Sequence, residues 1–370
     1  MSNINKFFCF FTAKYLKLHP EKIIFEMKKS IKILLAVFLA AGIVAGVVGF
    51  NIYNKVYSAN VFIKDTEYLY IRNGADFQTV LDSLYKNFDV KDKDGLEFVA
   101  NRKNYPSKIK GGRYKLSDKM SSNALINLLR SGSQSEVNLA FNNLRTVKQL
   151  CSRVAQKIDV DSNMLYDLLK NEEYLKKFGF NPETCNAMFI PDTYNFYWNT
   201  SEESFVEKMY SYYQKFWTDE RKKKAAAINL TPLEVSILAS IVQMEQARFK
   251  DEQPVIAGLY INRMKIGMPL QSCPTLIYAI GDFSIRRVTG KMLEFDSPYN
   301  TYKYPGLPPS PICFPEKSAL EAVLDYDRND YIYMCAKSDF SGRHFFSKSY
   351  EDQKRHARDF QRELDKQGIK

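Results

Sequence analysis

The chain has 370 residues, a formal net charge of +11, six cysteines and three histidines, and its length predicts two or more domains once any tail or anchor is set aside. Seven lysines and two glutamates lie in the first 32 residues, and no basic segment interleaved with aromatic residues follows, so we expect no nucleic-acid partner. The sequence has no HExxH, CxxC, GxSxG, P-loop or Rossmann glycine pattern, and we therefore expect no metal and no cofactor.

An apolar run occupies residues 33–53, and its first 18 positions carry no charge. That length is sufficient to cross a bilayer. Because the lysines precede it, the positive-inside rule predicts a cytoplasmic tail over 1–32, a single transmembrane helix over 33–53 in the inner (cytoplasmic) membrane, and an extracytoplasmic or periplasmic remainder. A cleaved signal peptide with Met27 as the true start is the alternative, but the long run without a clear small-residue cleavage site favours an anchor.

Residues 54–140 have the pattern of a small α+β module. Aromatic and β-branched residues predict extended structure over 60–71, and helical spacing follows over 75–88. The remaining predicted elements are a helix over 96–102, a strand over 111–116 and a helix over 123–130.

Residues 141–370 predict a larger, mainly helical α+β domain. The expected helices cover 146–158, 163–170, 203–216, 232–245, 254–266, 316–325 and 350–366, and paired strands cover 331–336 and 344–347. Five widely spaced cysteines follow the apolar run, which leaves room for one disulfide but predicts no disulfide framework.

The helix over 232–245 carries a carboxylate among apolar residues. Thr231, Pro232 and Glu234 form a capping-box start, which sets the register. At about 100° per residue, Glu245 points into an apolar arc that includes Leu238, and Gln243 faces away. A desolvated carboxyl keeps its proton to higher pH, as a general acid must.

A structural ion pair is the alternative for this carboxylate. Buried carboxylates are commonly paired, and Arg248 and Arg263 are close enough in sequence to be the partner.

The segment 268–315 is predicted to be a long loop, rich in proline and in Asn, Thr, Tyr and Gln. Sugar hydroxyls need convergent donors and acceptors, and sugar faces pack on aromatic rings, so this composition suits carbohydrate recognition. A proline-stiffened structural loop is the alternative.

Six segments of the chain together resemble the YceG-like endolytic murein transglycosylases, single-pass envelope enzymes that cut peptidoglycan glycan strands. The segments are 189–194 (FIPDTY), 238–245 (LASIVQME), 260–267 (YINRMKIG), 270–275 (LQSCPT), 299–302 (YNTY) and 306–312 (GLPPSPI), with a weaker match through His344. The resemblance implies a LysM-like module over 54–140 and a YceG-like catalytic domain over 141–370.

The chain departs from the family pattern at four positions. The family's helix motif usually has two glutamates, and only the second, Glu245, is present here. Cys273 stands where an aspartate is common, Asn186 where a glutamate is usual, and Gln353 near a frequent histidine. These departures leave the candidate acid in place.

The resemblance implies non-hydrolytic cleavage between N-acetylmuramic acid and N-acetylglucosamine with Glu245 as acid and then base, which leaves a 1,6-anhydro end. It implies substrate contacts from Asn262, Arg263, Gln271, Thr275, Asn300, Tyr302 and His344, and structural support from Asp192 and Tyr194. Expected partners are glycan strands, the membrane and a cell-wall synthesis complex.

Two other functions stay open. A hydrolytic muramidase would need a second carboxylate, for which Glu252, Asp282, Glu294 and Asp296 are candidates. A membrane-anchored glycan-binding scaffold would need no chemistry.

Overall fold

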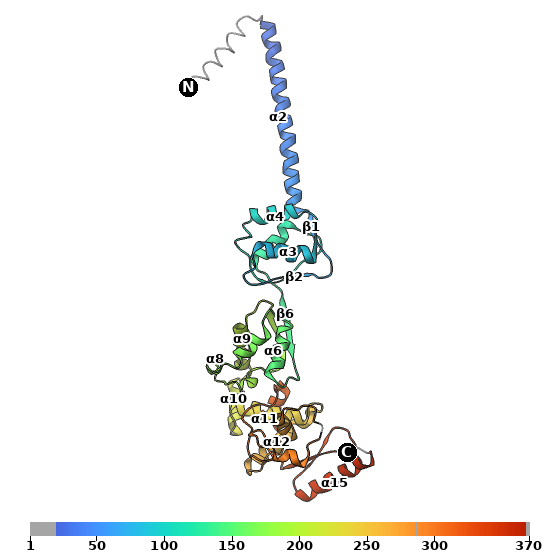
Figure 1. Ribbon diagram of the computed structural model, residues 1–370. Helices are drawn as coiled ribbons and strands as arrows, with labels where there is room; N and C mark the ends of the chain where they lie inside the picture. The colour runs from blue at the N-terminus through green and yellow to red at the C-terminus, as the bar shows by residue number, and fades with distance from the viewer. Residues whose placement is uncertain (1–19, 286, 368–370) are drawn as a thin grey trace. The chain divides into compact units, whose positions relative to one another are not determined.

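The computed structural model describes residues 20–285 and 287–367. The chain divides into two compact units, with the boundary between Gln134 and Ser135. Helices and short antiparallel strands alternate in both, so the fold is mixed α+β (Figure 1). Most of the expected tail, residues 1–19 with Cys9 and His19, lies outside the described residues.

The first described element is the long helix α2, Pro20–Tyr57 (Figure 1). Its segment Ile31–Tyr57 contains an 18-residue window with a mean hydropathy of 2.7, and no part of that window is buried inside the protein. Large apolar side chains such as Leu35, 62% exposed, therefore face outward. α2 is long and apolar enough to cross a membrane.

The rest of the first unit is a small module. Strand β1, Ala59–Ile63, pairs antiparallel with β3, Phe88–Val90, and with β5, Met120–Ser121, and β2, Tyr68–Ile71, pairs with β4, Gly112–Lys115. Helices α3, Phe77–Asn87, α4, Lys93–Arg102, and α5, Ser122–Ser131, begin at the capping side chains of Asp76, Asp92 and Ser121. Leu69, Leu84 and Tyr114 lie in its core.

The second unit begins with strand β6, Glu136–Phe141, which pairs along its whole length with β7, Asp192–Tyr197. β6 therefore belongs to the larger unit, although the sequence pattern predicts a module that extends to residue 140. Around this pair lie α6, Val147–Ala155, α7, Ser162–Leu168, α8, Glu172–Lys176, the 3₁₀ turn η1, Cys185–Met188, and α9, Glu202–Phe216. One core cluster, with Leu139, Phe196 and Phe205, joins them.

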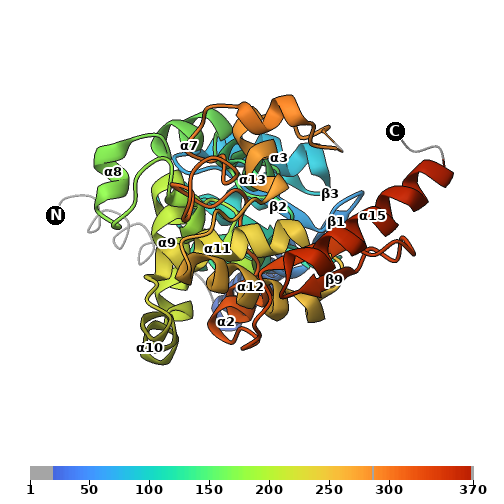
Figure 2. The same cartoon turned by 90° about the horizontal axis from the view of Figure 1, so that it is seen from below.

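The second core of this unit is built around α11, Pro232–Glu245, which packs beside α12, Gln253–Lys265 (Figure 2). The other elements are α10, Asp219–Ala227, η2, Lys250–Glu252, α13, Cys273–Ile280, η3, Gly290–Glu294, and α14, Lys317–Leu324. The hairpin β8, Tyr333–Ala336, and β9, His344–Ser347, carries α15, Tyr350–Lys366, against it (Figure 2).

The segment 268–315 is not a plain loop, because it contains α13 and η3. Pro274 stands in the first turn of α13, where its missing N–H leaves no intrahelical hydrogen bond unmade. Gly281, at φ 79, ends the helix in the left-handed region. The proline-rich composition thus concealed a short helix.

Helix α11 begins as predicted, with Thr231 and Glu234 in a reciprocal capping box. The expectation that Gln243 faces away from the protein core is wrong. Every residue from Val235 to Gln243 is buried, and the Gln243 side-chain oxygen accepts a hydrogen bond of 2.6 Å from the Glu316 backbone N–H. α11 is therefore packed on all sides rather than along one apolar arc.

Candidate active site

Glu245 is the last residue of α11, and two hydroxyl groups hold one of its oxygens. The Tyr260 hydroxyl donates to Oε1 at 2.8 Å and the Ser272 hydroxyl donates to the same atom at 2.5 Å. Oε2 has no hydrogen bond to a described residue and is not among the buried unpaired atoms. It is therefore the oxygen that is open to a ligand.

Three segments far apart in sequence place these groups. Tyr260 lies on α12, fully buried, and Ser272 is the residue before α13. Ser272 would ordinarily cap that helix, but its side chain makes no capping bond because the hydroxyl goes to Glu245. Its backbone N–H instead donates to the Thr301 hydroxyl at 3.0 Å.

Burial raises the pKa of Glu245 above its ordinary value, against the opposing effects of the Ser272 and Tyr260 hydrogen bonds and of the charges of His344 and Arg263. The two donors and the two basic groups favour the carboxylate, but desolvation is the largest effect. This carboxyl therefore keeps its proton to higher pH than an exposed glutamate does.

The predicted alternative, an ion pair that neutralises Glu245, does not form among the described residues. Arg263 is buried, and its guanidinium donates to the carbonyl oxygens of Ile332 and Leu270, each at 2.6 Å. Arg248 lies over the Phe249 ring, 4.9 Å from its centroid. Arg263 thus acts on Glu245 only through its charge, and burial lowers its own pKa.

Tyr302 and Cys273 lie next to each other beside this carboxyl. The Tyr302 hydroxyl and the Cys273 sulfur are 2.9 Å apart, and the pKa of each is raised first by burial and further by the charge of Glu245. Cys273 is the exposed one of the five described cysteines, all of which are free. A thiol thus stands at the surface of the site.

Thr275 and Asn300 support the walls of the site. The Thr275 hydroxyl donates to the Ser272 carbonyl at 2.8 Å and lies 2.8 Å from the Thr301 hydroxyl, fully buried. The Asn300 amide donates to the carbonyls of Leu293 and Phe295, and its oxygen accepts from the Tyr302 backbone. Both side chains are occupied by the protein itself.

Two further predicted contacts lie elsewhere. The Asn262 amide donates to the carbonyls of Asn329 and Tyr331, at 2.8 and 3.1 Å, and so ties α12 to the segment before β8. Gln271 is exposed at a left-handed φ of 50°, and its backbone N–H donates to the Thr301 carbonyl. Of these two, only Gln271 adjoins Ser272, and its side chain makes no hydrogen bond to a described residue.

His344, at the start of β9, is held by Glu252. The ring Nδ1 lies 2.9 Å from Glu252 Oε2, and the backbone N–H of His344 donates to Oε1 at 3.2 Å. Gln246, the residue after Glu245, donates to the same carboxylate at 2.9 Å. His344 is therefore linked through Glu252, by two hydrogen bonds, to Gln246 at the end of α11.

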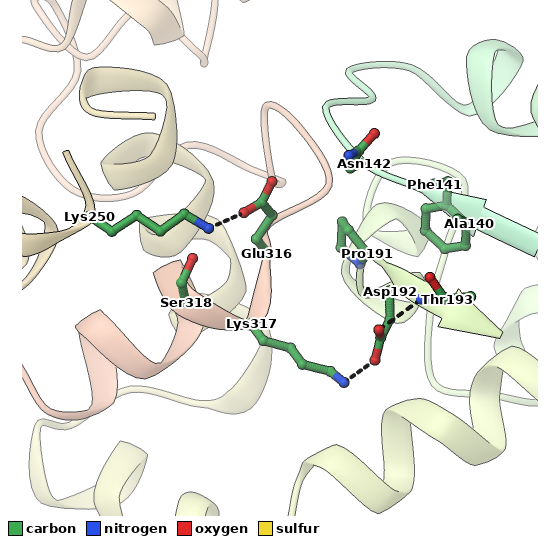
Figure 3. A pocket seen from close by; sticks show the side chains of 10 residues that line it. All are labelled: Ala140, Phe141, Asn142, Pro191, Asp192, Thr193, Lys250, Glu316, Lys317 and Ser318. Carbon is green, nitrogen blue, oxygen red and sulfur yellow. Dashed lines mark hydrogen bonds and ion pairs between the residues drawn. The ribbon is translucent and has the colours of Figure 1, made fainter. Parts of the chain in front are cut away.

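Asp192 and Tyr194, the predicted supports, lie away from the Glu245 hydroxyl cluster. The Tyr194 hydroxyl donates to the Ile190 carbonyl, and its ring stacks on Phe141. Asp192 forms an ion pair with Lys317 and lines an open cavity of about 320 Å³ between the ends of β6 and β7 and the start of α14 (Figure 3). A second ion pair, Lys250 to Glu316 at 2.9 Å, lines the same cavity.

A smaller cavity, of about 180 Å³, lies beside the neighbours of the candidate acid. Met244 and Pro274, adjacent in sequence to Glu245 and Cys273, line it together with Tyr278 and Phe283, and Arg145 stands over the Phe283 ring at 4.9 Å. Aromatic and apolar walls with one cation suit a sugar ring and its substituents. No group of described His, Cys, Asp and Glu side chains is arranged to hold a metal ion.

The sequence did not predict that Ser272 and Tyr260 hold the Glu245 carboxyl, or that Glu252 holds His344. Tyr260 and Ser272 both lie in the matched segments, but a hydroxyl 15 or 27 residues from Glu245 gives no periodic signal. The serine directly before Cys273-Pro274 was the available clue, because such a residue is usually a helix cap.

Comparison with known proteins identifies the relatives of this chain. A family model described as the YceG-like family matches residues 69–359. The endolytic murein transglycosylase of Bacillus subtilis (strain 168) is 29% identical over 309 residues, which cover 78% of this chain and 83% of that protein. The endolytic murein transglycosylase of Streptococcus pneumoniae serotype 2 (strain D39) is 26% identical over 321 residues, and the match spans 78% of this chain and 57% of that longer protein.

The fold has a counterpart among solved structures. The crystal structure of a putative yceG-like protein from Listeria monocytogenes superposes with a TM-score of 0.51 at 24% identity, covering 78% of this chain and 98% of that one. Because the family model spans most of the chain, including α11, α12 and α13, this protein belongs to the YceG-like family.

Proposed function

We propose that this protein is an endolytic lytic transglycosylase that cleaves the bond between N-acetylmuramic acid and N-acetylglucosamine in peptidoglycan and leaves 1,6-anhydro ends. The observation that carries the proposal is the state of Glu245. Its carboxyl is held by two neutral hydroxyls on one oxygen, has no ion pair among the described residues, and has a raised pKa. The relatives named murein transglycosylases support the substrate.

The proposed reaction uses one carboxyl twice. Glu245 gives a proton from Oε2 to the glycosidic oxygen as the bond from that oxygen to the muramyl C1 breaks. The resulting carboxylate takes the proton of the muramyl C6 hydroxyl, whose oxygen bonds to C1 and closes the anhydro ring. Proton and charge balance without water, and Tyr260 and Ser272 stabilise the carboxylate between the two steps.

Three of the four other candidate carboxylates are engaged elsewhere, and the fourth, Glu294, is exposed at the end of η3. This favours the single-carboxyl mechanism over a muramidase. Asp296 is bound by Lys303 at 2.7 Å and by Tyr304 at 2.5 Å, and Asp282 accepts from Ser284 at 2.6 Å. Glu252 is bound by His344 and Gln246. A hydrolase needs a second carboxylate free to act on water or on the sugar.

We propose that the residues nearest to Glu245 bind the substrate. His344, Tyr302 and Cys273 each lie close enough to interact electrostatically with Glu245, and Gln271 is exposed next to Ser272. Arg263, Thr275 and Asn300 hold the walls, whereas Asn262, Asp192 and Tyr194 brace other parts of the unit.

We further propose that α2 anchors the enzyme in the cytoplasmic membrane with the N-terminus inside, and that the module before Gln134 is LysM-like and binds glycan. The basic residues before the apolar run and its outward-facing side chains support the anchor. An anchored enzyme would meet newly made strands, where cell-wall synthesis proteins are expected partners.

Mass analysis of fragments released from purified peptidoglycan tests the reaction. Anhydro ends, which are one water lighter than reducing ends, are the expected product. Reducing ends would make the protein a muramidase. Intact strands that remain bound to wild-type protein would make it a scaffold without catalysis.

A further inference from the structure

Glu252 is a buried carboxylate with three hydrogen-bond donors around it, and the Arg343 guanidinium lies 3.5 Å from its Oε1. It lies seven residues after Glu245, in η2, and is 7% exposed. His344 contributes its ring Nδ1 and its backbone N–H, and Gln246 contributes its side-chain amide. The ring and backbone contacts from one residue fix both the position of His344 and the orientation of its imidazole.

The Gln246 side chain is itself fully fixed. Its amide nitrogen also donates to the Gly342 carbonyl at 2.9 Å, and its oxygen accepts from the backbone N–H groups of Arg248 and Phe249. The turn after Glu245 is thereby bonded to the turn that leads into β9. Glu252 is the common acceptor between these two turns.

Glu252 is ionised in this arrangement. Burial alone would raise its pKa, but the hydrogen bonds from His344 and Gln246 outweigh burial and lower the pKa below the ordinary value. An ionised carboxylate has no proton to donate, so the hydrogen between Glu252 and the ring must be carried by Nδ1. In the neutral ring, Nε2 is then the nitrogen without a proton.

The Nε2 atom is free for a ligand. It makes no hydrogen bond to a described residue and is not among the buried unpaired atoms, and the same holds for Glu245 Oε2. His344 also lies close enough to Glu245 for a charge on its ring, when protonated, to act on that carboxyl. Two open polar atoms therefore belong to one electrostatic neighbourhood.

We propose that Glu252 is a positioning residue, which fixes His344 with Nδ1–H on its carboxylate so that Nε2 accepts a hydrogen bond from a sugar hydroxyl of the strand bound at Glu245. The inference rests on the proposed function and deepens it. A carboxylate on Nδ1 makes Nε2 of the neutral ring a stronger acceptor and prevents the neutral ring from presenting an N–H to the same hydroxyl. Glu252 itself does not touch the sugar.

The neighbouring Asp251 provides a matched control. It forms an exposed ion pair with Arg343 at 2.7 Å and has no contact with the His344 ring. The same guanidinium lies 3.5 Å from Glu252, so Asp251 shares with Glu252 the charge contact but not the ring contact. If Glu252 served only to join the turns through charge, loss of the Asp251 carboxylate would act in the same way.

The test compares Glu252→Gln, Asp251→Asn, His344→Gln and the double variant Glu252→Gln/His344→Gln in the full-length protein in detergent. Nitrogen-15 NMR at a pH where the ring is neutral reads the tautomer of His344, identified by the signal that His344→Gln removes. Cleavage kinetics on peptidoglycan give kcat and KM, and melting temperatures check the fold.

We expect only the Nδ1–H tautomer in wild type and in Asp251→Asn. Glu252→Gln should show a mixture, because an amide can present either its oxygen or its NH₂ to the ring, and kcat/KM should fall roughly 10–100-fold. His344→Gln should lose as much, and the double variant no more than either single one, since the two residues act as a unit.

The proposal is overturned if Glu252→Gln changes the tautomer and leaves kcat/KM intact, or if its loss persists in full on the His344→Gln background. An equal loss in Asp251→Asn would also overturn it. Failure of the proposed function looks different, because wild type would then cleave nothing. In that case the inference is tested without cleavage, by the His344 tautomer and by the glycan affinity of Glu245→Gln with and without Glu252→Gln. The inference stands if Glu252→Gln changes the tautomer and weakens glycan binding, and it is overturned if glycan binding does not change.

Discussion

Two carboxylates of the same unit, Glu245 and Asp192, meet opposite surroundings. Glu245 ends a fully packed helix, is held by two neutral hydroxyls, and has a raised pKa because of burial. Asp192 begins β7 at the edge of an open cavity, where the hydrogen bond from the Lys317 ammonium lowers its pKa (Figure 3). The matched family segments contain both residues, but only Glu245 keeps its proton to a higher pH than an ordinary carboxyl does.

The difference shows which neighbours matter. A cation within hydrogen-bond distance holds a carboxyl in its charged form, whereas hydroxyl donors compensate only part of the desolvation. A site for proton donation therefore needs a buried carboxyl from which cations are kept at a distance. Arg263 satisfies this condition because the Ile332 and Leu270 carbonyls engage its guanidinium.

The largest expected effect separates the two carboxylates by activity. Glu245→Gln should lower strand cleavage at least 10³-fold, since it removes the only proposed acid and base, while Asp192→Asn should change it less than about threefold. Release of soluble fragments from purified peptidoglycan measures both. Equal losses in the two variants would mean that the acid has been assigned to the wrong region.

The second-largest effect is expected from alkylation of a cysteine near Glu245, compared with alkylation of a cysteine at position 192. Cys273 is exposed beside Tyr302, and alkylation there should obstruct the site and lower kcat/KM on the order of 10²-fold. Cys273→Ser should resist the reagent. In the Cys273→Ser background, Asp192→Cys places a thiol at the cavity that Asp192 lines. Alkylation of that thiol should cause little loss of activity. Mass spectrometry confirms the modified residue.

Removal of one donor from each carboxylate should have a smaller and more specific effect. Ser272→Ala takes a hydrogen bond from the charged form of Glu245, so its pKa should rise further and the high-pH limit of activity should move upward. The rate at the optimum should fall about tenfold. Lys317→Gln should leave the pH–rate profile unchanged, and a shift in that variant would connect the Asp192 cavity to the chemistry.

The smallest effects are on stability, and they should have opposite signs. The folded state raises the pKa of Glu245 above 4.5, so wild type binds more protons folded than unfolded and loses stability as pH rises through the folded pKa. Glu245→Gln should lack that loss. Asp192 has a pKa below 3.8, so its contribution is present above that value and disappears as pH falls.

Melting curves from acid to mildly alkaline pH measure this pair of slopes. Relative to wild type, Glu245→Gln should gain at high pH, and Asp192→Asn should show its relative loss at neutral pH and recover it in acid. A Glu245→Gln curve parallel to that of wild type would mean that the carboxyl is not desolvated in solution.

Local patterns in the sequence predict α11 well and its surroundings poorly. Thr231, Pro232 and Glu234 determine where the helix starts, and the structure confirms that start. The buried side was misjudged because Ser240 and Gln243 appear polar, yet they are satisfied by the backbone of Ile312 and Glu316, more than 70 residues away. No periodicity within a helix carries that information.

The candidate site shows the same limit. Glu245 follows from helix geometry and from the family segments, and His344 from its motif. Ser272 and Tyr260 gain their meaning only when α12 and α13 bring them to one oxygen. Asn262 was expected at the site and instead ties α12 to Asn329, a contact 67 residues along the chain.

The packing of α11 on every side determines which parts can move during turnover. A helix that is buried on every side cannot shift without disrupting the core, so Glu245 is held in a fixed position. On the proposed function, any movement that admits a glycan strand has to come from residues other than those of α11.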